Sequence, residues 1–112
     1  MRLKLAHLER ETFACLFLDS QHRLLAFDAL FSGTIDCTHV HPRIVVQHAL
    51  RYNAAAVIAA HNHPCGIATP SASDIDLTQR LQRILTPLDI RLLDHIIVSR
   101  HGSSSLKELG KF

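Results

Sequence analysis

The apolar positions near the start of the chain predict a strand that is covered on both faces. Thr12 to Leu18 (TFACLFL) carries apolar and aromatic side chains at both alternating sets of positions, which is typical of a fully buried strand. Polar turn residues follow at 19–22, and an extended apolar pattern runs from Arg23 to Phe31 until Ser32 and Gly33 interrupt it. This order predicts a β-hairpin, with Thr34 to Thr38 as a third, shorter strand.

In the middle of the chain the apolar period changes to that of a helix. From Pro42 to about Asn53 apolar side chains recur at spacings of three and four, and Pro42 suits a first helical turn because no N–H bond is needed there. Ala54 to Ala60 (AAAVIAA) then has no polar face. Since it is short and directly follows a helix, we expect a central buried strand. His61 to Pro70, rich in proline and glycine, is expected to be the loop at the carboxyl end of that strand.

The last third of the chain predicts a second helix and a further strand. Ser71 to about Thr86 has acidic residues in its first turn, basic residues further on and an apolar stripe, and Pro87 ends it. Ile90 to Ser99 is rich in β-branched residues, which predicts a strand, and a turn at 100–103 leads to a last strand or short helix at Ser104 to Leu109. Because no repeat or linker interrupts this order, we expect residues 1–112 to form a single domain of the mixed α/β class.

Composition and charge narrow the class of protein. The chain has 112 residues, of which 47% are apolar and 20% charged, as in an ordinary soluble domain with one core. Its longest apolar run, Ala54 to Ala60, is far shorter than the ~20 residues that cross a bilayer, so no membrane partner is expected. A net charge of +2 from scattered cations does not indicate nucleic-acid binding, although it leaves that partner open. The pattern gives no oligomeric state.

The cysteines indicate the compartment. Cys15, Cys37 and Cys65 are odd in number, widely spaced and without a CxxC pair, which argues against a disulfide framework or a cysteine-rich zinc site. Residues 3–8 are broken by Lys4 and His7 and do not form the apolar stretch of a signal peptide. We therefore expect a protein of the reducing cytoplasm.

Candidate chemistry lies in one of two His-x-His-Pro sequences. The first, 39–42, is followed at the corresponding offsets only by Ala49 and Tyr52, whereas the second, 61–64, is followed by Ser71 and Asp74. Residues two apart in an extended segment point to the same side, so His61 and His63 should face one point beyond a buried strand. Clefts at the carboxyl ends of strands are where α/β sheets usually place their sites. The second pair is therefore the candidate site.

A carboxylate and a base complete this candidate site. Asp74 lies on the inward stripe of its predicted helix, where a carboxylate needs a partner. Two imidazoles and one carboxylate are ligands that Zn²⁺ prefers, with a fourth position left for water, and this arrangement predicts metal-assisted hydrolysis. Among the three glutamates, Glu11 directly precedes the first buried strand and is our candidate general base.

Each of these residues also has an ordinary structural interpretation. Ser71 and Asp74 at a helix start fit a capping box, in which both only satisfy backbone donors. His61 and His63 fit a surface or hydrogen-bonded pair, and Glu11 fits a solvated charge in a run of charged residues. These interpretations do not explain why all the residues occur in one ordered register.

That register resembles the JAMM signature of the JAB/MPN metalloproteases, in which two histidines are followed by serine and aspartate. The matching residues here are His61-x-His63-Pro64-x-Gly66-x-x-x-Pro70-Ser71-x-x-Asp74. The segments RETFACLFLD, AAAVIAAHNHP and LLDHIIVS are similar to the bacterial RadC-like branch of this family. The resemblance covers the chain from about Glu9 to Leu109.

The resemblance implies a fold and a reaction. The fold is a mixed β-sheet flanked by helices, similar to the cytidine-deaminase-like architecture. The site implied is Zn²⁺ on His61, His63 and Asp74, with Glu11 as proton shuttle and Ser71 as donor to the tetrahedral oxyanion. The usual target of such enzymes is a peptide or isopeptide bond, so we expect a zinc metallopeptidase or isopeptidase with a peptide or protein substrate of unknown identity.

Three positions call for separate interpretation. Cys65 stands where serine is common in this branch, and Ile44 where an acidic residue is common. The Cys65 thiol is a possible further ligand or oxidation point, but a small buried filler is favoured. His95 lies either next to the metal ligands or beside Asp94 as its partner in the strand, and we favour the structural role.

The alternative function is a RadC-like DNA-repair-associated module that binds nucleic acid or processes it with a metal. Full-length RadC-like proteins carry an N-terminal helix-hairpin-helix region that is not in this sequence, so DNA binding inferred from that region is not expected to transfer. Base deamination needs H-x-E and P-C-x-x-C, but Ala68 stands in place of the second cysteine after Cys65. The sequence His61-Asn62-His63 is not an HNH nuclease signature either, because those residues are dispersed over a ββα unit.

Overall fold

The computed structural model of the chain describes residues 11–32, 40–63, 68–100 and 102–112. Within these ranges two strands come first, a helix, a strand and a second helix follow, and two further strands come last, in the order that the sequence predicts. They are β1 (Thr12–Leu18), β2 (Leu24–Ser32), α2 (Pro42–Arg51), β3 (Ala56–Asn62), α3 (Ala72–Leu85), the 3-10 helix η1 (Thr86–Leu88), β4 (Arg91–Ser99) and β5 (Gly102–Ser105). The strand expected at 34–38 lies outside the described residues. No helix of the described part is long and apolar enough to span a membrane.

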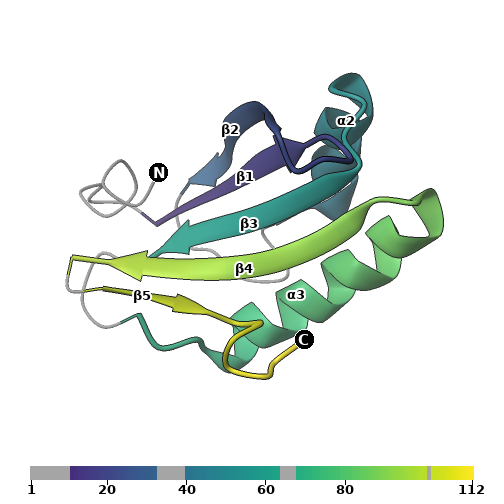
Figure 1. The fold of residues 1–112 in the computed structure, drawn as a ribbon. Helices are drawn as coiled ribbons and strands as arrows, with labels where there is room; N and C mark the ends of the chain where they lie inside the picture. Colours follow the sequence, from purple (N-terminus) through teal and green to yellow (C-terminus); the bar gives the residue numbers. More distant parts are fainter. Residues whose placement is uncertain (1–10, 33–39, 64–67, 101) are drawn as a thin grey trace.

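The five described strands form one mixed sheet in the order β2-β1-β3-β4-β5. β1 pairs antiparallel with both β2 and β3, whereas β3 and β4 are parallel. The apolar segment that lacks a polar face is therefore the central strand, β3, as expected. Figure 1 shows that the carboxyl ends of β3 and β4 lie at the same end of the sheet as the start of β1. The end of β3 therefore lies close to the residue that precedes β1.

The helices α2 and α3 pack on the same face of the sheet. Phe17 of β1 contacts Tyr52 at the end of α2, with ring centroids 5.3 Å apart, and the first turn of α3 reaches His61 of β3. The main core lies between the sheet and these helices, and its larger members are Phe13, Phe17, Val45, Val57, Leu77, Leu81, Leu85 and Leu92. A smaller cluster of Ala14, Ala60 and Val98 lies apart from this core, with Phe27 and Ile96 packed against it. The mixed α/β class predicted from the sequence is confirmed.

β4 contains one residue more than its parallel partner. Val57 pairs with Leu92 but the next residue, Ile58, pairs with Asp94, so Leu93 is a bulge. The bulge shifts the alternation of side chains along the rest of β4. Leu92 before it belongs to the main core, and His95 beyond it pairs with Ala59 of the same core.

Several element boundaries differ from those expected, and three of the differences have a clear structural reason. β3 continues through His61 and Asn62, which we expected in the loop, because β1 and β4 both pair with His61 and β4 also pairs with Asn62. α2 ends at Arg51 instead of about Asn53, since Asn53 adopts a left-handed conformation (φ 55°) and Ala54 N–H bonds back to the Ala49 carbonyl at 2.8 Å.

The last strand also lies earlier than expected. β5 spans Gly102–Ser105 and is followed by a turn, whereas we expected a strand or short helix at Ser104 to Leu109. The Asp94 carboxylate explains the early end, because it accepts hydrogen bonds from the Ser105 hydroxyl and, at 3.1 Å, from the Lys107 N–H. These bonds turn the chain away from the edge of the sheet.

Candidate metal centre

Three side chains that the sequence singled out meet at the carboxyl end of β3. His61 lies in the strand, His63 directly after it, and Asp74 in the first turn of α3. Nδ1 of His61 is 3.1 Å from Oδ1 of Asp74, and Nε2 of His63 is 3.4 Å from Oδ2 of the same carboxylate. One ligand atom from each residue lies within 4.8 Å of the other two. The structure therefore brings this predicted trio together.

The environment of these atoms fits a metal ion. His61 and Asp74 are 1% and 2% exposed, yet Nδ1 of His61 makes no hydrogen bond, despite its short distance to Asp74. A buried polar atom without a partner costs about 1–3 kcal/mol, so such atoms are rare unless an additional group satisfies them. Imidazole and carboxylate are the ligand types that zinc and related divalent ions take in proteins. The His61-His63-Asp74 group can thus bind a metal ion.

Asp74 has a structural role besides facing the histidines. The Ser71 hydroxyl accepts a hydrogen bond from Asp74 N–H at 3.1 Å, and Oδ2 of Asp74 accepts one from Ser71 N–H at 2.8 Å. The capping box that we considered for Ser71 and Asp74 is therefore present. Burial alone would raise the pKa of Asp74, but the proximity of His61 and the hydrogen bonds from Ser71 outweigh it and hold that pKa well below its usual range. The carboxylate is ionised at neutral pH, as a metal ligand must be.

Glu11 lies at the edge of the same site. Its Oε2 is 3.4 Å from Nε2 of His61, and its side chain is 35% exposed. The pairing of β1 with β3 explains this contact, because Phe13 lies opposite His61 and Glu11 comes just before the strand. The candidate base therefore reaches both the histidine and solvent.

Asn62 is a site residue that our sequence reasoning did not identify. Its side chain is buried, and its Oδ1 accepts a hydrogen bond from the backbone N–H of Thr12. Thr12 directly follows Glu11, so Asn62 fixes the point at which the chain enters β1 beside the site. A polar residue at the end of an otherwise apolar central strand was the signal available in the sequence.

His95 and Thr78 lie behind the three ligands. Nδ1 of His95 is 2.6 Å from Oγ1 of Thr78, and that hydroxyl donates to the Asp74 carbonyl at 2.8 Å. Burial, with a further contribution from nearby His61, lowers the pKa of His95 to about 4, so the ring is neutral at pH 7. The alternative that the His95 ring pairs with Asp94 does not agree with these contacts, since His95 bonds that carboxylate through its backbone N–H, at 2.7 Å, while its ring bonds Thr78. Thr78 was not identified from the sequence, although it lies four residues after Asp74 on the inward side of α3.

A second cluster of histidine and aspartate lies on β2 and α2. Oδ2 of Asp28 is 2.8 Å from Nδ1 of His48 and accepts a hydrogen bond from the Tyr52 hydroxyl at 2.6 Å. These hydrogen bonds, chiefly that from Tyr52, lower the pKa of Asp28 although partial burial opposes them. We refer to Asp28, His48 and Tyr52 as the Asp28 cluster. It ties an outer strand of the described sheet to α2.

The remaining sequence candidates divide between described and undescribed residues. His41 is exposed at the start of α2, 5.9 Å in ring centroid distance from Phe31, and its partner in the first His-x-His sequence, His39, lies outside the described residues. Cys37 and Cys65 lie outside them as well. Cys15 is buried in the core, and burial together with the charge of Asp28 raises the pKa of its thiol. Cys15 is therefore a protonated, unreactive thiol at neutral pH.

The fold and the donor group together define a mixed α/β domain with a site that can bind a metal ion. The family model of the RadC-like JAB domain matches residues 1–111, which is nearly the whole chain. The chain therefore belongs to the RadC-like JAB domain family. The mixed sheet of the described residues, with α2 and α3 packed against it, agrees with the JAB/MPN fold that the sequence resemblance implies.

Similar curated proteins come from several bacteria. The UPF0758 protein of Pseudomonas savastanoi pv. phaseolicola is 51% identical over 110 residues, which are 98% of this chain and 49% of that protein. That of Cellvibrio japonicus is 56% identical over the same shares of both chains. The UPF0758 protein YkfG of Escherichia coli is 54% identical over 98% of this chain and 70% of its own length. The chain thus spans about half the length of the first two relatives, and their names state no activity.

Proposed function

We propose that this chain is the catalytic domain of a zinc-dependent hydrolase that cleaves amide bonds in peptide or protein substrates, either peptide or isopeptide bonds. The observation that carries the proposal is the convergence of His61, His63 and Asp74 on one point, with a buried imidazole nitrogen that has no hydrogen-bond partner. Family membership supports the same conclusion, because the JAB family includes metalloproteases.

The chain's own residues would divide the work among them. When bound, the metal ion supplies a water nucleophile at neutral pH and polarises a carbonyl group. His61, His63 and the ionised Asp74 hold the ion. Glu11, 3.4 Å from His61 and partly open to solvent, accepts the proton of the attacking water and returns it to the leaving amine.

Ser71 has two roles in this proposal. Its hydroxyl oxygen accepts the Asp74 N–H as part of the capping box, at 3.1 Å. Its own proton remains available for donation to the oxyanion that develops during attack on a carbonyl. The exposure of Ser71 at the start of α3 leaves that hydroxyl accessible to a substrate.

The decisive experiment compares two glutamates in the zinc-loaded protein with a panel of fluorogenic peptide and isopeptide substrates. We expect Glu11→Gln to lower kcat by about 10²–10⁴-fold, because the general base is lost, while bound zinc remains stoichiometric. Glu108→Gln is the matched control, since Glu108 is exposed in the turn after β5 and should leave kcat unchanged. Equal activity of Glu11→Gln and wild type, or the absence of hydrolysis in zinc-loaded wild type, would contradict the proposal.

A second substitution separates the two roles of Ser71. Glycine at a helix N-cap costs only a few tenths of a kcal/mol, whereas it removes the hydroxyl donor completely. We therefore expect Ser71→Gly to keep near wild-type stability and zinc affinity but to lower kcat by about 10²-fold. An unchanged kcat would restrict Ser71 to helix capping.

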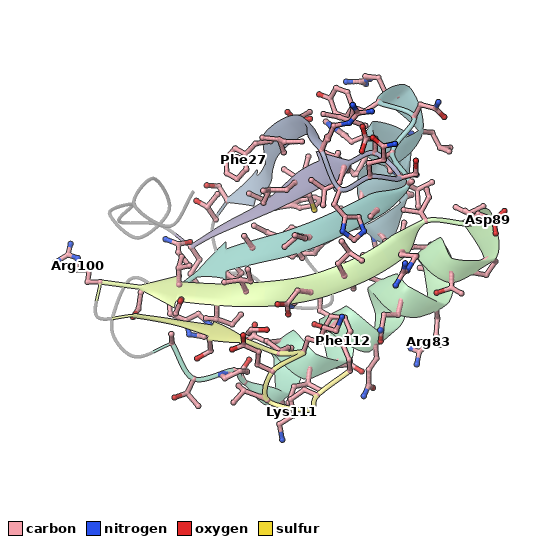
Figure 2. The ribbon with its side chains drawn as sticks, viewed as in Figure 1. Phe27, Arg83, Asp89, Arg100, Lys111 and Phe112 are labelled. Atoms are coloured by element: carbon pink, nitrogen blue, oxygen red, sulfur yellow. The ribbon has the colours of Figure 1, made fainter. Side chains whose placement is uncertain are left out.

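Nucleic-acid binding, the alternative function, receives less support from the distribution of charge. Figure 2 shows Arg83 on α3, Arg100 after β4 and Lys111 near the C-terminus, each on a different part of the surface. Duplex binding needs cations gathered on one face or stripe. Tight, salt-sensitive binding of duplex DNA in a gel-shift experiment would reverse this ranking.

A further inference from the structure

Behind the three candidate ligands lies a buried chain of hydrogen bonds from β4 to α3. His95 is completely buried, and its Nδ1 lies 2.6 Å from Oγ1 of Thr78. The Thr78 proton is already used, since Oγ1 donates to the Asp74 carbonyl at 2.8 Å. Oγ1 therefore accepts from His95, which fixes the neutral tautomer with its proton on Nδ1. The hydrogen bonds therefore run, from donor to acceptor, from His95 to Thr78 and from Thr78 to Asp74.

This series of hydrogen bonds ends on Asp74, the candidate metal ligand that α3 supplies. Asp74 is held by Ser71 at its N–H and at its carboxylate, but both of these bonds come from its own helix cap. Thr78 also belongs to α3, so the bond from His95 ties the backbone of this helical turn to β4 of the sheet. Because His95 pairs with Ala59, two residues before His61, the link comes from the strand next to the histidine ligand.

His95 is too distant to act as a ligand itself. Its ring centroid is 6.1 Å from that of His61, and the group of ligand atoms within 4.8 Å among the described residues contains only the other three side chains. Nε2 of His95 is buried and has no hydrogen-bond partner. The side chain thus lies near the site without belonging to the ligand set.

We propose that His95 is a positioning residue, which acts through the Thr78 hydroxyl to hold Asp74 in the orientation that metal binding requires. The inference rests on the metal site of the proposed function but not on hydrolysis. Residues that orient metal ligands typically contribute 10–100-fold to metal affinity, which sets the size of the expected effect.

The experiment measures Zn²⁺ affinity by competition with a chromogenic chelator at constant pH, with the thermal stability of the metal-free proteins recorded in parallel. We expect His95→Leu and Thr78→Val each to weaken Zn²⁺ binding about 10–100-fold. The double variant should lose no more than either single variant, because both substitutions break the same chain of bonds.

Conservative variants separate positioning from packing. Thr78→Ser keeps the hydroxyl. His95→Asn keeps an N–H donor that is the same number of covalent bonds from the backbone as Nδ1–H. Both variants should therefore retain a Zn²⁺ affinity within about threefold of wild type. His48→Asn is the matched control, since His48 belongs to the Asp28 cluster and should leave Zn²⁺ affinity unchanged.

Each outcome decides the inference. Zn²⁺ affinities that stay at the wild-type value in His95→Leu and Thr78→Val, even with lower thermal stability, would show a role in packing alone and overturn it. Equal losses in the conservative variants would overturn it as well. Wild type that binds zinc but hydrolyses no amide would contradict the proposed function and leave this inference standing, whereas wild type that binds no zinc would overturn both.

Discussion

The Asp28 cluster and the candidate metal centre both combine histidine with aspartate, yet their geometries differ. In the Asp28 cluster one carboxylate oxygen lies 2.8 Å from the histidine nitrogen and 2.6 Å from the tyrosine hydroxyl. At the carboxyl end of β3 the two oxygens of Asp74 each face one histidine nitrogen, Nδ1 of His61 at 3.1 Å and Nε2 of His63 at 3.4 Å. Nδ1 of His61 makes no hydrogen bond. The side chains of the first cluster are hydrogen-bonded to one another, whereas the second cluster leaves the buried Nδ1 atom of His61 without a hydrogen bond.

The difference shows that residue type alone does not identify a metal site. Direct hydrogen bonds between histidine and aspartate satisfy both side chains and tie two elements together. Ligand atoms that converge from a strand end and a helix start, with one buried nitrogen that has no hydrogen bond, can hold an additional group such as a metal ion. The comparison therefore separates a structural cluster from a candidate metal centre by geometry.

The largest expected effect is on stabilisation by metal. Zn²⁺ at about a thousand times its Kd should stabilise the wild-type fold by about 4 kcal/mol, which for a chain of this size raises Tm by on the order of 10 °C. Asp74→Asn should abolish most of this rise, since a neutral amide is a poor ligand, whereas Asp28→Asn should keep it. Thermal unfolding with zinc and with chelator measures both, and similar rises in the two variants would remove the distinction between the clusters.

A smaller effect is expected on the stability of the metal-free protein. Asp28→Asn should lower the free energy of unfolding at pH 7 by about 1 kcal/mol, because two hydrogen bonds lose their charged acceptor. The pKa of Asp28 is lower in the folded than in the unfolded state, so its contribution is present above the unfolded value of about 4 and is lost as pH falls below it. Urea midpoints at pH 7 and at about pH 2.5 test this sign. A difference between variant and wild type that persists unchanged in acid would refute it.

The smallest effect concerns the tyrosine of the Asp28 cluster. Tyr52→Phe removes one hydrogen bond but leaves Asp28 paired with His48, so its urea midpoint should fall less than that of Asp28→Asn. Zinc affinity should remain at the wild-type value. A midpoint loss larger than that of Asp28→Asn would mean that the ring, and not the carboxylate, holds the cluster together.

Much of the fold follows from local patterns in the sequence. Thr12 to Leu18 is a strand with the predicted bounds, because its apolar side chains on both faces leave no other stable arrangement. Ser71 caps α3, and the central strand lies where an apolar run without a polar face predicts it. The extension of β3 to Asn62 was not predictable, since it depends on pairing with strands distant in the sequence.

The candidate site was predictable as a set of residues but not as a geometry. The spacing of His61, His63 and Asp74 indicates ligands that converge, and the structure brings them together. The roles of Asn62 and Thr78 depend on contacts between separate elements, with Thr12 and with His95, which no local pattern contains. The roles assigned to Glu11 and Ser71 in catalysis stay predictions.

The extra residue at Leu93 determines which changes of length β4 can accept. Side chains alternate along a strand, so without the bulge Leu92 and His95 would face opposite sides of the sheet. Deletion of Leu93 would therefore remove the unpaired residue and leave Leu92 and His95 on the helix side of the sheet, opposite Val57 and Ala59. One codon lost at the bulge thus spares the pairing that places His95 beside Thr78, whereas one codon lost between His95 and Val98 would turn every later side chain of β4 to the opposite face of the sheet.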